Sequence, residues 1–236
     1  MKNVFLQSFN FKLKMSATEK ETVQPVKKGS FIQENTKSLA FIAGAIIVLI
    51  GIFIWYQGVY LKNRAEEASS KMFKVEQFVG VDSLANQAIK GEGGFDGLET
   101  IAKEYENTKS ANLANLYLGG LYLRKGEYKQ AVDALSKYSA TGSPVIDPLA
   151  LGLLGDAYSE LKDYKQASTY YKKAIDKSSN KFTSPMFLKK LGLVNENLKD
   201  FKGAEEAYTK IKTQFPESTE AQMIDSYIAR ATAQVK

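Results

Sequence analysis

The longest apolar stretch of the chain runs from Ser38 to Leu61, 24 consecutive residues without a charged side chain, and Lys37 and Lys62 bracket it. An α-helix rises about 1.5 Å per residue, so roughly 20 apolar residues cross the hydrocarbon core of a bilayer. Aromatic side chains, which favour the membrane–water interface, lie near its end: Trp55, Tyr56 and Tyr60. The stretch is long for a core helix or a cleavable signal peptide. We therefore predict a transmembrane helix over residues 38–61.

Three later segments repeat one apolar pattern and align on Leu118-Gly119, Leu154-Gly155 and Leu191-Gly192, with glycines 36 and 37 residues apart. An aromatic residue lies nine residues after each glycine, an alanine lies twelve residues after it, and a larger apolar or aromatic residue lies sixteen residues after it. These residues are Tyr128, Tyr164 and Phe201, then Ala131, Ala167 and Ala204, and finally Leu135, Tyr171 and Tyr208. The spacing is helical and is interrupted once in each copy, which predicts two antiparallel helices joined by a tight turn.

The repeated glycines and alanines predict where the two helices of each hairpin touch, because larger side chains would separate them. A single hairpin cannot bury its apolar face, so the hairpins must stack into a solenoid. Residues 218–235 carry small and apolar residues at helical spacing after Ser218, which is typical of a capping helix. The expected fold class is all-α: one transmembrane helix followed by an α-solenoid of three hairpins with capping helices.

Four segments follow from these patterns. Residues 1–37 are expected to form a short, mostly disordered basic tail, in which Met15 is an alternative start. The transmembrane helix occupies 38–61. Residues 62–97 are expected to form a helical stalk that ends in the glycine-rich stretch KGEGGFDG, with apolar positions at Ala65, Ala68, Met72, Val75 and Val79. The repeat domain and its capping helix occupy 98–236.

Composition argues against several classes of function. The chain has no cysteine and no histidine, which removes thiol nucleophiles, disulfides, and thiolate or imidazole metal sites. The net charge is +6, but residues 1–37 hold seven lysines against three glutamates, so residues 62–236 carry 25 basic and 23 acidic side chains, only +2. The predicted folded part is close to neutral, and nucleic-acid binding loses its main support.

We find no catalytic constellation in the sequence. The stretch GEGGFDG lacks the Gly-Lys-Ser/Thr ending of a phosphate loop and the alternating ligands of an EF-hand. Ser136 and Lys137 are adjacent on a helix and point in different directions, so they form no dyad. We therefore expect no enzyme activity, no cofactor and no metal.

Charge does not fix the topology of the predicted membrane helix. Four basic residues lie within twenty residues on each side of it: Lys20, Lys27, Lys28 and Lys37 before it, and Lys62, Arg64, Lys71 and Lys74 after it. The short basic tail is easier to retain in the cytoplasm than a long domain. We expect the N-terminus to be cytoplasmic and the repeat domain to lie across the membrane.

Stacked helical hairpins bind partners on the concave surface, which the first helix of each hairpin lines. The candidate groove residues are therefore the positions of these helices that are expected to lie outside the core: Tyr117, Arg124, Asp156, Glu160, Lys189, Glu196 and Asn197. Their mixed charges suggest a partner segment that carries both signs. The alternative is that these are solvated polar positions without a binding role.

A second candidate contact lies within the predicted membrane helix. Gly44, Gly51 and Gly58 recur every seven residues, and Ala40 lies one turn before Gly44. Small residues on one face let membrane helices approach and pack. The hypothesis is that this stripe docks against the membrane helix of a partner; the alternative is that glycine is simply common in membrane helices.

The repeat pattern resembles the tetratricopeptide repeat: Leu-Gly, a tyrosine three residues later in the first two copies, the turn, and then alanine followed by leucine or tyrosine. The third copy departs from it, with Asn195 in place of the tyrosine. The whole arrangement, over about residues 30–236, resembles the YfgM-like ancillary subunit of the SecYEG translocon. The stretches SANLANLYLGGLYL, PLALGLLGDAYSEL and FTSPMFLKKLGLVNENL are similar to versions found in Bacteroidota. The resemblance implies a bacterial inner-membrane protein with a periplasmic repeat domain. It also implies protein partners, namely SecYEG, a PpiD-like membrane-anchored chaperone and exported chains.

Two other interpretations fit the same sequence features. One is an adaptor subunit of another cell-envelope secretion or assembly complex. The other is a receptor of the opposite topology, which faces the cytoplasm.

Overall fold

The computed structural model describes residues 35–235, and all of their regular elements are helical. Residues 1–34 of the predicted tail, with the alternative start at Met15, lie outside the described residues. The last residues predicted for the tail, Thr36 and Lys37, belong to α3. The chain divides into two compact units at Trp55–Tyr56. The described part of the first unit is α3 (Thr36–Trp55); the second begins with the π-helical segment η1 (Tyr56–Tyr60).

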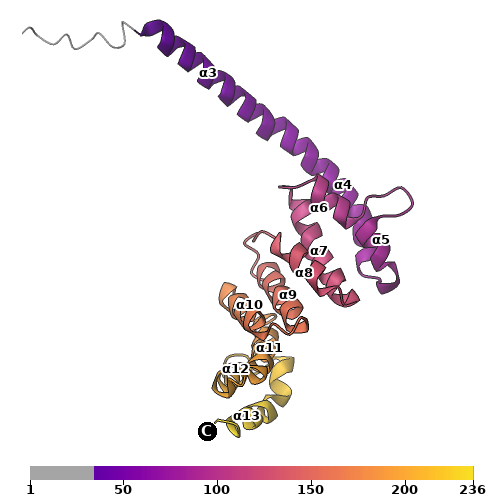
Figure 1. Cartoon of the computed structure of the whole chain (residues 1–236), viewed down its shortest axis with the longest axis vertical. Helices are drawn as coiled ribbons and strands as arrows, with labels where there is room; N and C mark the ends of the chain where they lie inside the picture. The colour runs from indigo at the N-terminus through magenta and orange to yellow at the C-terminus, as the bar shows by residue number, and fades with distance from the viewer. Residues whose placement is uncertain (1–34, 236) are drawn as a thin grey trace, which may run out of the picture. The chain divides into compact units, whose positions relative to one another are not determined.

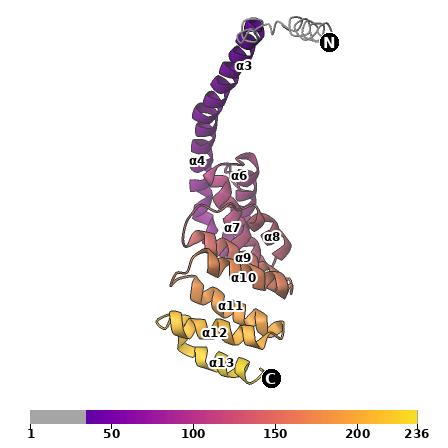
Figure 2. The same cartoon turned by 90° about the vertical axis from the view of Figure 1, so that its left-hand side faces the viewer.

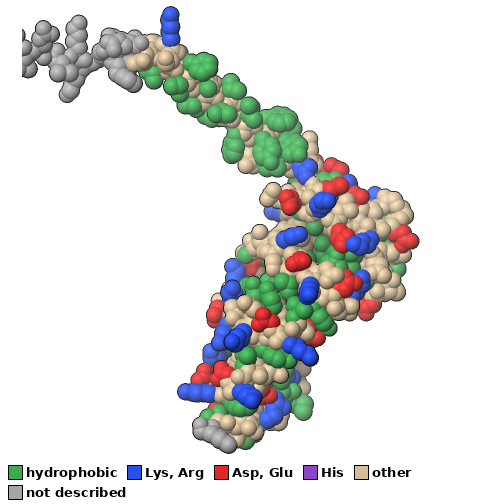
Figure 3. Space-filling view, viewed as in Figure 1, with side chains coloured by type: hydrophobic (Ala, Val, Ile, Leu, Met, Phe, Trp, Pro, Cys, Tyr) green, Lys and Arg blue, Asp and Glu red, His purple; other side chains and the backbone are tan. Residues whose placement is uncertain are grey.

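Helix α3 has no buried residue. Its hydrophobic side chains cover its surface (Figure 3). Among the described residues, one helical run, Thr36–Val79, is long and apolar enough to cross a membrane, judged by length and composition; its most apolar window has a mean hydropathy of 2.6.

The second unit contains the three predicted hairpins, which follow one another along the chain and end at α13 (Figures 1 and 2). They are α7 (Lys109–Lys125) with α8 (Tyr128–Ser136), α9 (Ile146–Glu160) with α10 (Tyr164–Lys177), and α11 (Ser184–Asn197) with α12 (Phe201–Gln214). Helices α8 and α10 also contact the first helix of the next hairpin, and α12 contacts α13. The prediction of an all-α fold with helical repeats is confirmed.

Each hairpin closes through a turn residue in the left-handed conformation. This residue is Gly126 in the first hairpin, Lys162 in the second and Lys199 in the third, with φ between 60° and 77°. The next residue in the last two hairpins is an aspartate that caps the second helix: Asp163 accepts from the backbone N–H of Gln166, and Asp200 from that of Gly203. These caps satisfy N–H groups that the helix itself leaves unpaired.

The glycines of the repeat lie where the two helices of a hairpin touch. A Cβ atom added to Gly155 would lie 2.6 Å from the ring of Tyr171, sixteen residues later. Cβ atoms on Gly119 and Gly192 would likewise collide with Leu135 and Tyr208. The structure therefore has the register that the sequence predicts.

The segment expected to form a stalk contributes to the core of the second unit. Helix α4 (Leu61–Val79) buries Ala68, Met72 and Val75, which belong to one hydrophobic cluster with residues of α5 (Ala85–Lys90), α6 (Leu98–Glu104) and α7. A short 3₁₀ turn, η2 (Asp82–Leu84), separates α4 from α5. Helix α4 is thus a packed neighbour of α7.

Polar contacts also hold α4 against α6. The ring of Tyr105 contacts two cations, with the Arg64 guanidinium 5.3 Å and the Lys71 ammonium 5.0 Å from its centroid. Its hydroxyl donates to Glu67 at 2.5 Å, and Lys71 pairs with Asp96 of the glycine-rich loop at 2.7 Å.

The C-terminal cap comprises the 3₁₀ turn η3 (Thr219–Met223) and α13 (Ile224–Thr232). Ser218 accepts a hydrogen bond from the backbone N–H of Ala221, and α13 buries Ile224 and Ala231 against α12. The predicted capping helix therefore covers the last hairpin.

Candidate protein-binding groove

A groove of about 880 Å³ runs along the first helices of the three hairpins, with the end of α4 at its border. The border consists of Val79, the last residue of α4, and Gly80, which follows it. Most of the remaining lining comes from α7, α9 and α11. Tyr128 at the start of α8 and Tyr171 in α10 also contribute.

The lining repeats in register with the hairpins. Counted from the glycine of each Leu-Gly pair, the positions that recur in the lining are six and two before it and one and five after it. In α7 these are Leu113, Tyr117, Gly120 and Arg124; in α9 they are Leu149, Leu153, Asp156 and Glu160; in α11 the last three are Lys190, Leu193 and Asn197. This 4-3-4 spacing places them on one face of each helix.

Five of the seven predicted groove residues line this groove: Tyr117, Arg124, Asp156, Glu160 and Asn197. The other two lie against the capping helix. The Lys189 ammonium is 5.0 Å from the ring centroid of Tyr227 in α13. Glu196 accepts hydrogen bonds from Arg230 of α13 and from Tyr208 of α12. Lys189 and Glu196 thus hold α13 in place.

The apolar part of the groove was absent from the sequence prediction, which selected polar positions only. Leu113, Leu149, Leu153 and Leu193 all line the groove, and Leu193 is 38% exposed. Lys190 was also missed. For three of them the signal is the register itself: Leu153 and Lys190 occupy the position of Tyr117, and Leu193 occupies that of Asp156. Leu113 and Leu149 occupy a position at which no groove residue was predicted.

The charged side chains of the groove make contacts within the chain. Lys190 pairs with both carboxylate oxygens of Asp156 at 2.7 Å, and the hydroxyl of Tyr171 donates to Asp156 at 2.7 Å. Arg124 donates to the backbone oxygen of Val79 at 2.6 Å and lies 3.2 Å from a carboxylate oxygen of Asp82. Lys190 thus joins α11 to α9, and Arg124 joins α7 to the end of α4 and to η2.

Three tyrosines of the lining remain protonated donors at neutral pH. Burial, together with the charge of Asp156, raises the pKa of Tyr171. Burial and the nearby Glu76 raise the pKa of Tyr117. A hydrogen bond to Glu160 raises the pKa of Tyr128. The groove therefore offers phenol hydroxyls, paired charges and apolar surface, which suit the binding of a polypeptide segment. No group of three or more metal-ligating side chains occurs within residues 35–235.

The predicted small-residue stripe falls on two elements. Ala40, Gly44 and Gly51 lie in α3, and Gly58 lies in η1. A Cβ atom added to any of the three glycines would have no atom within 4 Å. The glycine positions are therefore open to a larger side chain or to a neighbouring helix.

Comparison with known families finds two matches, both described as the tetratricopeptide repeat. One covers residues 149–178 and the other residues 190–218, which correspond to the second and third hairpins. No curated protein matches the chain.

Proposed function

We propose that this tetratricopeptide-repeat protein is a membrane-anchored, non-catalytic scaffold that holds a segment of a partner protein in the groove of α7, α9 and α11. The observation that carries the proposal is the repetition of the lining. The first helices of three successive hairpins contribute the same face to one groove of about 880 Å³.

Helix α3 supports the membrane anchor. It is long and apolar enough to span a bilayer, and its side chains are exposed along its length. Exposure of so large an apolar surface to water is unfavourable by about 25 cal/mol per Å². A lipid environment removes this cost.

More specifically, the protein is proposed to be an ancillary subunit of the protein-export translocon in the bacterial inner membrane. In this role, the N-terminus is cytoplasmic and the repeat domain binds partners or newly exported chains in the periplasm. Its partners are SecYEG and a PpiD-like membrane-anchored chaperone. The support is the resemblance of residues 30–236 to the YfgM-like subunit, together with the order of elements along the chain.

The topology is tested with two reporters fused after Lys236. Alkaline phosphatase becomes active only where its disulfides form, and green fluorescent protein exported through the translocon does not fluoresce. We expect phosphatase activity and no fluorescence. The reverse result places the repeat domain in the cytoplasm and removes the periplasmic role.

The partners are tested by crosslinking in intact cells, followed by purification of the full chain in mild detergent and mass spectrometry. Enrichment of translocon subunits supports the specific proposal. Enrichment of another secretion or outer-membrane assembly complex instead identifies the alternative, an adaptor of that complex, and overturns the translocon role.

The stripe of Ala40, Gly44, Gly51 and Gly58 is proposed to pack against a membrane helix of the partner, since small residues permit close approach. The variant Gly44→Leu/Gly51→Leu keeps the helix apolar and fills the stripe within α3. The matched control, Ile47→Leu/Ile54→Leu, has the same spacing on other positions of α3. We expect the crosslinked partner to be lost from the first variant only. Retention in both makes α3 an anchor without a docking role.

A further inference from the structure

We infer that the groove selects uncharged, apolar segments of polypeptide, which is a different ligand from the mixed-charge segment that the sequence suggests. This inference rests on the proposed function and names the class of segment bound. It follows from two features of the groove: which of its charged groups already have partners, and which side chains remain exposed.

The charges that could select a ligand are paired within the chain. A ligand carboxylate that approached Arg124 would compete with Asp82 and with the backbone oxygen of Val79. A charged group of either sign that approached Asp156 or Lys190 would compete with a contact made at 2.7 Å to both carboxylate oxygens. Separating Lys190 from Asp156, whose side chains are 35% and 21% exposed, leaves a partly buried charge uncompensated, which is costly. The Arg124–Asp82 pair is more exposed, at 45% and 85%, and contributes less.

Glu160 is the remaining charged residue of the lining, and its contact is a hydrogen bond from Tyr128. It is exposed at the end of α9. Interactions of exposed charges are weak and are screened by salt. Glu160 therefore contributes little to the selection of a ligand.

The surface available to a ligand between these pairs is apolar. Leucines occupy the groove face of every first helix, at Leu113, Leu149, Leu153 and Leu193. Ile146 adds a side chain that is 37% exposed at the start of α9. Burial of such surface by an apolar segment is favourable and involves no competition with an internal ion pair.

The test uses the full chain in lipid nanodiscs, because detergent would itself occupy an apolar groove. The probes are three fluorescent peptides of about 15 residues, which span up to about 50 Å when extended. The first peptide contains leucine, valine, glutamine and serine and has no charged residue. The second is the same peptide with each leucine replaced by serine. The third is the second peptide with alternating lysine and glutamate residues added. Empty nanodiscs measure binding to lipid.

We expect the leucine-containing peptide to bind and the other two to bind at least about tenfold more weakly, since the burial of each leucine side chain is favourable. Its affinity should change less than about twofold between about 0.1 M and 1 M salt, although the Debye length falls from about 10 Å to 3 Å. Glu160→Gln should leave the affinity unchanged.

A matched pair of variants locates the binding. Leu193→Ser changes a groove leucine that is 38% exposed, and Leu198→Ser changes a leucine of similar exposure, 36%, that is outside the groove lining. We expect Leu193→Ser alone to weaken the leucine peptide, by about tenfold. Tighter binding of the charged peptide, with a steep salt dependence and loss in Glu160→Gln, overturns the apolar selection but keeps the groove function. Absence of binding by all three peptides, or equal effects of the two leucine variants, overturns both.

Discussion

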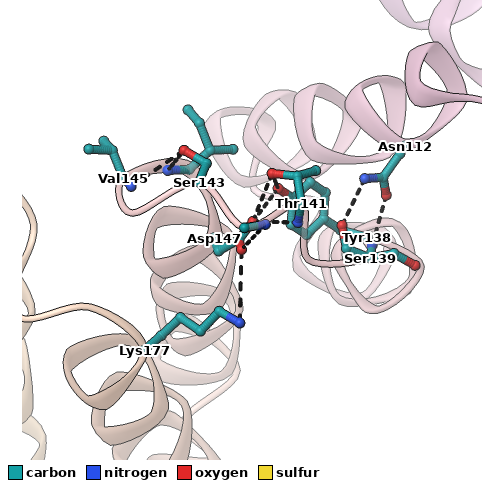
Figure 4. A network of polar contacts seen from close by, with 10 residues as sticks. Asn112, Tyr138, Ser139, Thr141, Ser143, Val145, Asp147 and Lys177 are labelled. Carbon is teal, nitrogen blue, oxygen red and sulfur yellow. Dashed lines mark hydrogen bonds and ion pairs between the residues drawn. The ribbon is translucent and has the colours of Figure 1, made fainter.

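The loops that join successive hairpins use two different side chains for the same task. In the loop between α8 and α9, the carboxylate of Asp147 accepts from the backbone N–H groups of Thr141 and Gly142, each at 2.9 Å (Figure 4). The hydroxyls of Thr141 and Tyr138 also donate to it, and its side chain is 1% exposed. Asp147 therefore fixes this loop against the first turn of α9.

In the loop between α10 and α11, a neutral amide takes the same role. The carbonyl oxygen of Asn180 accepts from the backbone N–H groups of Phe182 and Thr183 at 2.9 and 2.8 Å. Its amide nitrogen donates to the hydroxyl of Thr183, and it also reaches the preceding loop through the backbone oxygen of Pro144 at 3.0 Å. Asn180 thus orders its own loop and joins it to the one before.

One junction therefore depends on a charged side chain and the other on a neutral one. Both loops fix how one hairpin follows the next, and so they position α7, α9 and α11 along the groove. A buried carboxylate with four donors is a stronger anchor than an amide, but it can be protonated. The loops should therefore differ in the size of their contribution and in its dependence on pH.

The largest effect is expected from Asp147→Ala. The change leaves two backbone N–H groups and the Tyr138 hydroxyl without their acceptor, and hydrogen bonds to charged groups contribute about 1.5–3 kcal/mol each. We expect the free energy of unfolding to fall by about 3 kcal/mol, measured by urea denaturation of the full chain followed by circular dichroism. A loss below about 1 kcal/mol would mean that the carboxylate does not anchor this loop.

Asn180→Ala should have a smaller effect, about 1.5 kcal/mol, because its hydrogen bonds are between neutral groups and the side chain is only partly buried. The same denaturation experiment measures it. Ser179→Ala, one residue earlier at an exposed position, is the matched control and should unfold with the parent. If Asn180→Ala costs more than Asp147→Ala, the ranking of the two anchors is wrong.

The pH dependence should separate the two loops. Burial alone would raise the pKa of Asp147, but the hydrogen bonds from Thr141, Tyr138 and Gly142 lower it overall. Because the folded-state pKa lies below the unfolded value of about 3.9, this stability is present above that pH. It is lost as the pH falls through the folded-state pKa, at about 1.4 kcal/mol for each unit of depression.

Unfolding of Asp147→Asn should therefore be less sensitive to pH below about 4 than unfolding of the parent. Asn180→Ala should keep the parental pH dependence, because its anchor does not titrate. Equal pH profiles for the parent and Asp147→Asn would contradict the assignment of the acid-sensitive contribution to this carboxylate.

The smallest effect is expected from Lys177→Met. Its ammonium lies 3.9 Å from the Asp147 carboxylate, but the side chain is 42% exposed. Such pairs contribute about 0–1 kcal/mol, and we expect a loss below about 0.5 kcal/mol by the same measurement. A loss as large as that of Asp147→Ala would show that the ion pair, and not the set of hydrogen bonds, anchors the loop.

Much of the fold could be predicted because its signals are local or periodic. The absence of charge over residues 38–61 identifies the apolar helix without reference to the rest of the chain. The constant step from Gly155 to Tyr171, and from Gly192 to Tyr208, predicted the contacts that the structure places there. The site was harder to predict, since polarity alone selected Lys189 and Glu196, which contact α13, and passed over Leu153 and Leu193.

For the three hairpins, the sequence was sufficient to predict where the helices lie, which of them pair and the register of each pair, because helical periodicity and the size of a side chain at a close contact act over short distances along the chain. It did not predict that α4 packs against α6 and α7. Which charged side chains form pairs could be read only from the packed structure. Lys190 is 34 residues from Asp156, and Arg124 is 45 residues from Val79. An ion pair forms only where two side chains come within a few ångströms of each other. The stacking of whole hairpins sets that distance. The same stacking leaves leucine side chains as the apolar surface of the groove.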